Sequence, residues 1–183
     1  LSGKGDTSQK LTLMKTSADS LKKSADALND SSLWEKKKIK KKDEKTGEEI
    51  EVEDYDWDKI TKAVKSFVED YNDVVKEAGE SNTKDVLRNA SWMTGMTDKN
   101  SNMLAKIGIT IGKGNKLELD EDALKQADIS SLKTVFTGYN SFVSKISQKA
   151  TGISNAANRA SATYTNNGTY SKTDSSLTSS KID

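Results

Sequence analysis

The chain contains no cysteine, no histidine and no proline among its 183 residues. Without cysteine it forms no disulfide and offers no thiolate to a metal, and without histidine it lacks the most common general base and nitrogen ligand. The absence of proline leaves helices uninterrupted. No run of about 18 apolar residues occurs, so we expect no membrane insertion. These absences argue against thiol and metal chemistry, and we predict no catalytic residue, no metal and no cofactor.

The composition favours a thin, extended core. Only 33% of the residues are hydrophobic and 31% are charged, a balance that suits narrow helix seams better than a thick globular core. The 29 basic residues nearly cancel the 28 acidic ones, so no net field attracts nucleic acid or an anionic membrane. The lack of cysteine suits a protein that works outside the cell or is exported unfolded. Because the chain begins with Leu1 and not with Met, we expect a processed product or a fragment.

Three separate stretches carry an apolar residue at every third or fourth position. This period of 3.5 predicts helices over about 10–30, 57–78 and 139–164, and it is typical of coiled coils and long bundles. The three seams are Leu11, Met14, Ala18, Leu21, Ala25 and Leu28; Trp57, Ile60, Val64, Phe67, Tyr71, Val74 and Ala78; and Tyr139, Val143, Ile146, Ala150, Ile153, Ala157, Ala160 and Tyr164.

Isolated helices of this length are marginal in water, so each seam needs a partner from this chain or from another copy. An intrachain bundle and an oligomer both fit the pattern. The residues predicted to carry the packing are Ile60, Val64, Phe67, Tyr71, Val143, Ile146 and Ile153.

A block of opposite charges over 34–57 predicts a β-hairpin. Six lysines between Lys36 and Lys42 are followed by acidic residues, and a turn at 44–47 divides the two groups. Folding there places three opposite-charge pairs across from one another, each adding roughly 0.2–1 kcal/mol. In the same register Ile39 faces Val52 and Trp34 faces Trp57; the charged pairs are Lys42 with Glu49, Lys40 with Glu51 and Lys38 with Glu53. A solvated charged linker is the alternative interpretation.

The segment 83–138 predicts a small α+β unit. Thr83 can cap a helix that closes near Gly95, a helical turn follows at 100–106, and period-two apolar residues over 107–119 predict a second hairpin with a turn at 112–115. We expect Asp120 and Ser130 to cap two short helices. The inward residues of the first of these helices are predicted to be Val86, Leu87, Ala90 and Met93.

The resulting fold is mainly α: an elongated helical bundle or coiled coil with inserted small β-hairpins. We expect a flexible lead over 1–9, a helical bundle domain over 10–164 that includes the charged hairpin and the α+β segment, and a mobile polar tail over 165–183.

Three motifs between about residues 50 and 138 follow one another in the same order as in a known protein family. Ile50–Val52 leads into a helix with the run Phe67-Val68-Glu69-Asp70-Tyr71-Asn72; Leu104–Thr110 reads Leu-Ala-Lys-Ile-Gly-Ile-Thr; and Gly114–Glu121 with Leu124 precedes Val135–Gly138. Together they resemble the C-terminal region of the flagellar filament cap protein family (hook-associated protein 2, FliD). The family's large β-rich middle domains are absent, and one charged hairpin stands in their place.

This resemblance implies an exported, extracellular protein of the bacterial flagellum that oligomerises at the filament tip and assists flagellin addition. The partners expected from it are protein subunits, either flagellin or further copies in a homo-oligomer. Our leading hypothesis is thus a non-enzymatic, cap-protein-like structural protein that assists filament assembly or adhesion. The alternative is a secreted helical binding module that recognises a host or cell-wall ligand.

Several candidate sites have simpler explanations. Asp98–Asn102 begins like a calcium loop, but Met103 and Ile109 stand where that loop needs glycine and glutamate. The acidic run Asp120–Asp122 suits a helix N-terminus, where negative charge is favourable. The three tryptophans, Trp34, Trp57 and Trp92, fit buried anchors better than a glycan-binding face.

Overall fold

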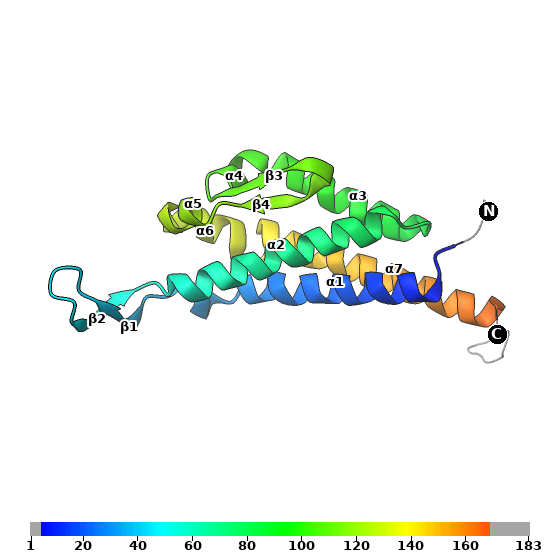
Figure 1. Cartoon of the computed structure of the whole chain (residues 1–183). Helices are drawn as coiled ribbons and strands as arrows, with labels where there is room; N and C mark the ends of the chain where they lie inside the picture. Colours follow the sequence, from blue (N-terminus) through cyan, green and yellow to red (C-terminus); the bar gives the residue numbers. More distant parts are fainter. Residues whose placement is uncertain (1–4, 169–183) are drawn as a thin grey trace.

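The structure, a computed structural model, describes residues 5–168, with side chains up to Thr163 (Figure 1). Residues 1–4 of the predicted lead and 169–183 of the predicted tail lie outside the described residues. The chain is mainly α with two inserted antiparallel hairpins, as predicted. Its elements are α1 (Ser8–Leu28), η1 (Ser31–Trp34), β1 (Lys37–Lys42), β2 (Glu49–Asp54), α2 (Trp57–Gly79), α3 (Lys84–Lys99), α4 (Ser101–Ala105), β3 (Ile109–Ile111), η2 (Lys113–Asn115), β4 (Leu117–Leu119), α5 (Glu121–Gln126), α6 (Ile129–Phe136) and α7 (Phe142–Gly168).

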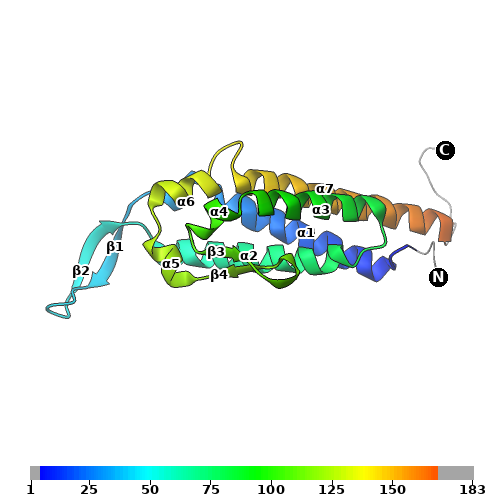
Figure 2. The same cartoon turned by 90° about the horizontal axis from the view of Figure 1, so that it is seen from above.

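Four of these helices form an elongated antiparallel bundle. α1 packs along both α2 and α7, and α3 closes the other side by packing on α7 and α2. Each helix runs opposite to its neighbours, so α1 begins and α7 ends at the same end of the molecule (Figures 1 and 2). α3 is shorter than the other three, and the segment from α4 to α6 covers the rest of the bundle.

The first two helices begin and pack as their sequence predicts. The Thr7 hydroxyl accepts a hydrogen bond from the Lys10 amide, and the Asp56 carboxylate accepts one from the Lys59 amide, so both helix starts are capped by side chains. Every residue of the α1 seam is at most 2% exposed, and the α2 seam is equally buried except for Trp57, which is half-buried. Helix α1 begins at Ser8, inside the segment assigned to the flexible lead.

The third helix differs from its prediction at the first seam position. Tyr139 is 84% exposed in the loop before α7, and the helix begins at Phe142, which is buried. Gly138 adopts a φ of 104°, a left-handed conformation that ends the preceding segment and separates Tyr139 from the seam. At its other end α7 continues to Gly168, past the start of the predicted polar tail at residue 165.

The charged block forms the predicted hairpin in the predicted register. Lys38, Lys40 and Lys42 lie opposite Glu53, Glu51 and Glu49, and Ile39 lies opposite Val52. The predicted pairing of Trp34 with Trp57 is wrong, because both lie outside the strands. The ring of Trp34 stacks on Phe136 at 5.7 Å between centroids, whereas Trp57 packs edge-on against Tyr55.

The segment from α3 to α6 follows the prediction with several corrections. The β3–β4 hairpin pairs Ile109 with Leu119 around a turn at 112–115, and Asp120 caps α5 through the Ala123 amide. Helix α3, however, runs through Gly95 to Lys99, and Leu87 faces solvent instead of the core. Helix α6 is preceded by Asp128 as its N-cap residue and not by Ser130, whose hydroxyl hydrogen-bonds the Asp128 side chain.

Candidate functional site

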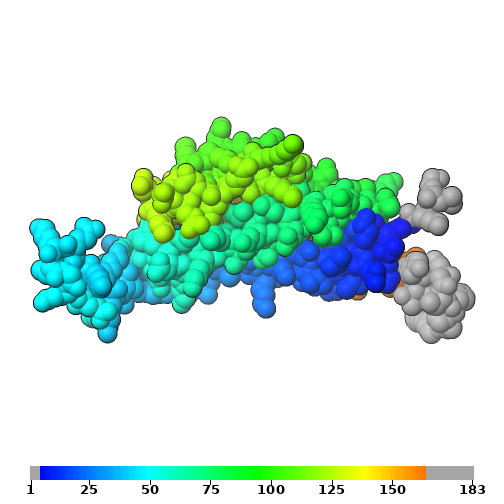
Figure 3. Space-filling model, in the orientation of Figure 1, coloured from blue at the N-terminus to red at the C-terminus, as the bar shows by residue number. Residues whose placement is uncertain are grey.

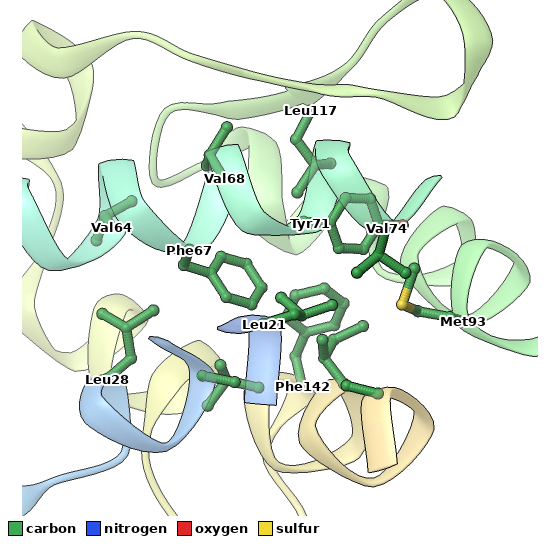
Figure 4. Close-up of a cluster of buried hydrophobic side chains, with 14 of the residues drawn as sticks. Leu21, Leu28, Val64, Phe67, Val68, Tyr71, Val74, Met93, Leu117 and Phe142 are labelled. Carbon is green, nitrogen blue, oxygen red and sulfur yellow. The ribbon is translucent and has the colours of Figure 1, made fainter. Parts of the chain in front are cut away.

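The bundle interior contains all seven predicted packing residues. Ile60, Val64, Phe67 and Tyr71 of α2 and Val143, Ile146 and Ile153 of α7 are each 0% exposed. Phe67 lies at the centre of this core between α1, α2 and α7 (Figure 4). Its ring is 6.2–6.4 Å, between centroids, from those of Tyr71, Phe136 and Phe142. Such edge-on and tilted aromatic pairs add about 0.5–1.5 kcal/mol each beyond the area that they bury.

One polar contact lies within this core. The Tyr71 hydroxyl donates to Thr97 Oγ1 at 2.8 Å, and the Thr97 hydroxyl donates in turn to the Met93 carbonyl at 3.0 Å. Burial raises the pKa of Tyr71 to about 12, with the Thr97 hydrogen bond acting in the opposite direction. Tyr71 therefore stays protonated at physiological pH, and it joins α2 to α3 as a hydrogen-bond donor.

Two asparagine side chains hold loop or strand backbone against the bundle. Asn72 of α2 donates to the Leu117 carbonyl at 2.9 Å and accepts from the Leu117 amide at 2.7 Å. Asn29, at the end of α1, makes the same pair of bonds with Gly138, at 3.2 and 2.9 Å. A side-chain amide can pair with a peptide group in this two-bond manner because it carries the same donor and acceptor. Asn72 thus attaches the β3–β4 hairpin to α2, and Asn29 attaches the loop before α7 to α1.

Two aspartates of α1 bind serines of α7 across the helix interface. Asp19 accepts from the Ser154 hydroxyl at 2.6 Å, and Asp26 accepts from the Ser147 hydroxyl at 2.7 Å. Each carboxylate also pairs with a lysine one turn earlier in α1. Burial acts to raise the pKa of Asp19 and of Asp26, but the hydrogen bonds from these lysines and serines outweigh it and lower both pKa values.

A third aspartate fixes the beginning of α1 to the loop between α2 and α3. The Asp6 side chain is fully buried and accepts three hydrogen bonds, from the Ser81 hydroxyl at 2.6 Å, the Thr83 hydroxyl at 2.6 Å and the Asn82 amide at 2.8 Å. Burial acts to raise the pKa of Asp6, but these hydrogen bonds and the nearby Lys10 ammonium lower it overall. Because Thr83 donates to Asp6, its side chain does not cap α3 as predicted.

We expect Asp6→Asn to reduce the free energy of unfolding by about 1–3 kcal/mol at about pH 7, because a buried charge-assisted hydrogen-bond network loses its anion. A carboxyl whose folded-state pKa is lowered stabilises the fold above its ordinary pKa of 3.8, and this contribution is lost as the pH falls below that value. The difference between variant and unmodified protein should therefore shrink on acidification. Urea unfolding at about pH 7 and about pH 3 measures it.

Asp98→Asn is the matched control for that experiment, since Asp98 lies exposed on α3. Its effect on the free energy of unfolding should stay within about 0.5 kcal/mol. If Asp6→Asn lowers the free energy of unfolding by the same amount at both pH values, Asp6 is not an ionised carboxylate at the centre of this hydrogen-bond network.

The most exposed feature of the described chain is the β1–β2 hairpin. It projects from the end of the bundle opposite to the start of α1, and its side chains stand clear of the helices (Figure 3). Two ion pairs within 4.0 Å join its strands, Lys41 to Asp54 at 2.7 Å and Lys40 to Glu49 at 3.9 Å. Exposed pairs of this kind contribute at most about 1 kcal/mol each.

The remaining candidate residues either belong to the packed structure or are exposed on the surface. Within residues 5–168, Asp98, Asn100 and Asn102 lie around the junction of α3 and α4, and no group of three or more acidic side chains in this range is arranged to hold a metal ion. Trp34 is buried, and its indole N–H donates to the Leu28 carbonyl at 2.7 Å. Trp92 is 53% exposed beneath the Lys149 ammonium, which lies 4.8 Å from its ring centroid.

Hollows for a small molecule lie on the surface of the described residues. Three of them, on the part of the chain that the structure describes, hold about 210–270 Å³, less than the roughly 300–1,000 Å³ of typical ligand pockets. No helix within residues 5–168 combines the length and the apolar character needed to cross a membrane. The geometry of the described residues is that of a packed bundle with a projecting arm.

A family model described as flagellar hook-associated protein 2 C-terminus matches residues 81–183. Since this match covers more than half of the sequence, the chain belongs to that family, whose members are structural proteins of the flagellar filament cap. The match includes Leu104–Thr110 and Gly114–Gly138, two of the segments that carried the resemblance, and it extends over α7. The Phe67–Asn72 motif lies before it. No curated protein and no solved structure matches the chain.

Sequence reasoning did not find the side chains that join the elements. Asp6 lies in the predicted flexible lead, and Asn29 lies near the end of the first predicted helix. Two signals were indirect. Asn72 belongs to the Phe-Val-x-x-Tyr-Asn run, in which Phe67 and Tyr71 face the core. The heptad spacing of Asp19 and Asp26, matched by that of Ser147 and Ser154, was also present in the sequence.

Proposed function

We propose that this chain is a non-enzymatic structural protein of the bacterial flagellum that acts outside the cell, at the filament. It works through contacts with flagellin or with other copies of itself and assists filament assembly. The family match over residues 81–183 carries this proposal. The small volume of the three described hollows and the absence of cysteine and histidine from the sequence agree with a role that needs no chemistry.

The bundle supplies a stiff body for such contacts. Helix α2 alone, with 23 residues, spans about 35 Å at about 1.5 Å per residue. The projecting hairpin lies at one end of this length, and α1 begins and α7 ends at the other (Figures 1 and 2). We infer that residues 10–164 act as one domain and that the seven packing residues keep its two ends at a fixed separation.

Location can be tested by labelling, because the chain has no native cysteine. Lys113 is exposed in the β3–β4 turn, so Lys113→Cys gives one reactive thiol on the surface. In a flagellated bacterium that encodes the protein, a membrane-impermeant maleimide dye should mark the filament ends, and the unmodified strain should stay dark. Dye along the whole filament, or no dye on intact cells with the variant expressed, would contradict the proposal.

The assembly role is tested by deleting the gene. Filaments should be short or missing and flagellin should accumulate in the medium, and the unmodified gene should restore filament growth. Filaments of normal length in the deletion strain would exclude a role in assembly.

A second candidate function, a secreted module that binds a host or cell-wall ligand, is favoured by one observation. Trp92 is the most exposed of the three tryptophans, and an exposed indole is a common platform for sugar rings. Binding to a glycan array that is lost in Trp92→Ala and kept in Leu87→Ala would support this function. An array without signal would reject it.

A further inference from the structure

The β1–β2 hairpin has two free edges that differ in charge. The sheet contains these two strands alone within residues 5–168, so the outer side of each strand pairs with no other strand there. The hairpin stands beyond the bundle, and no helix covers it (Figures 1 and 3). An exposed strand edge presents unpaired N–H and C=O groups to any chain that can align with it.

The backbone groups on these edges belong to the charged residues. The Asp43 amide donates to the Glu48 carbonyl at 2.8 Å, which makes this a hydrogen-bonded pair. Such pairs alternate along an antiparallel ladder, so every second residue turns its N–H and C=O outward. In the observed register, the outward residues of β1 are Lys38, Lys40 and Lys42, and those of β2 are Glu49, Glu51 and Glu53.

Each edge therefore carries charge of a single sign. Strand β1 has five lysines and no acidic residue, and β2 has four acidic residues and no basic one. If two copies joined the same strand across a two-fold axis, lysine would face lysine or glutamate would face glutamate, and directly opposed like charges are destabilising. Pairing of β2 from one copy with β1 of another places opposite charges together along the whole strand.

We propose that copies of this chain associate head to tail through their hairpins, with β2 of one copy against β1 of the next. The inference rests on the self-association included in the proposed function and names its surface. A head-to-tail contact leaves one basic and one acidic edge free, so it continues until a ring closes or a filament forms.

Geometry excludes a flat stack of parallel bundles. Each hairpin adds two strands, about 10 Å, whereas two packed helices occupy about 20 Å. Bundles attached to neighbouring hairpins cannot lie parallel at the shorter spacing. They must fan outward from the paired strands, which a closed ring or a twisted filament permits and a flat stack does not.

Disulfide cross-linking of the purified protein tests the pairing directly. Lys40→Cys and Glu51→Cys each place a single thiol at the centre of one strand in an otherwise cysteine-free chain. After mild oxidation, a mixture of the two variants should give about tenfold more cross-linked dimer than either variant alone, because like-charged edges avoid each other. Lys113→Cys mixed with Glu51→Cys is the control and should cross-link no more than the single variants.

Charge reversal supplies a second measurement by sedimentation. A triple variant that reverses the β1 edge should stay monomeric; its substitutions are Lys38→Glu, Lys40→Glu and Lys42→Glu. Reversing the β2 edge as well should restore association, because the two edges are then opposite in charge again; the added substitutions are Glu49→Lys, Glu51→Lys and Glu53→Lys. The association should weaken about tenfold between about 50 and about 500 mM NaCl.

Other outcomes overturn the inference. Equal cross-linking in the single variants and in the mixture would show that pairing is not head to tail. A protein that stays monomeric at high concentration would show that the charges only keep the edges apart. Neither result touches the labelling of filament ends, which tests the proposed function separately.

Discussion

Phe67→Ala is expected to lower the free energy of unfolding by about 3–5 kcal/mol, the range for removing a buried phenylalanine side chain. Phe67 is 0% exposed, and its ring contacts aromatic rings from α2, α6 and the start of α7. The variant loses three aromatic contacts and leaves a cavity where these elements meet. Since domains of this size are stable by about 5–15 kcal/mol, the loss is a large share of the total. Urea unfolding followed by circular dichroism measures it.

Trp92→Ala provides the matched control, because it also replaces an aromatic ring by a methyl group in a bundle helix. Trp92 is half-exposed, and its specific contact is the Lys149 ammonium over the ring, worth about 0.5–1 kcal/mol at an exposed site. Its effect should stay near 1 kcal/mol. Equal losses for the two variants would show that the cluster around Phe67 is not the centre of the core. Phe67→Asp should go further and abolish the cooperative transition.

Gly108→Ala is expected to cost about 3 kcal/mol or more, through two additive effects. Gly108 has a φ of 92°, and a side chain in such a conformation costs about 1–3 kcal/mol. An added Cβ would also lie 2.7 Å from the Asp120 carbonyl oxygen and 3.0 Å from the Leu124 amide nitrogen, both backbone atoms that cannot rotate away. Relief of this contact requires the start of α5 to move away from β3. Thermal unfolding should show the loss.

Gly114→Ala in the same hairpin separates these two effects. Gly114 also has a positive φ, of 69°, but an added Cβ meets nothing within 4 Å. This variant should lose only the conformational part, about 1–2 kcal/mol. If Gly108→Ala proves no more damaging than Gly114→Ala, the close approach of α5 to Gly108 does not limit stability.

The helices and both hairpins could be predicted from the sequence because local patterns determine them. The α1 seam repeats at steps of three and four, and each of its positions is buried. The charged hairpin followed from one turn and a fixed register, since the alignment that pairs lysine with glutamate at three positions also places Ile39 opposite Val52, an apolar pair that a one-residue shift would break. Asp120 was found as a cap because aspartate is a common N-cap residue and it directly precedes the short helix around Leu124.

What the sequence did not predict depends on contacts between distant segments. Nothing near Asp6 indicates that Ser81 and Thr83 lie beside it, 75 residues or more along the chain. Tyr139 continued the seam pattern by coincidence, whereas Gly138 had already turned the chain away from the bundle. Charged arms such as the hairpin leave the bundle because their strands lack an apolar face broad enough to pack on it.

The serine–aspartate contacts between α1 and α7 repeat at seven-residue intervals, and this has a consequence for how the two helices stay aligned. A sliding motion of seven residues, about 10 Å, would bring Asp26 to Ser154 and Asp19 to Ser161 and so rebuild both contacts. Polar pairing alone thus tolerates a shifted alignment. The apolar packing of α7 does not, because large Phe142 is buried at the start of the helix and small Ala156 and Ala157 are buried near its other end, so a slipped helix would open voids. The two hydrogen bonds between the Asn29 side chain and the Gly138 backbone, just before α7 begins, also fix a single alignment of the two helices.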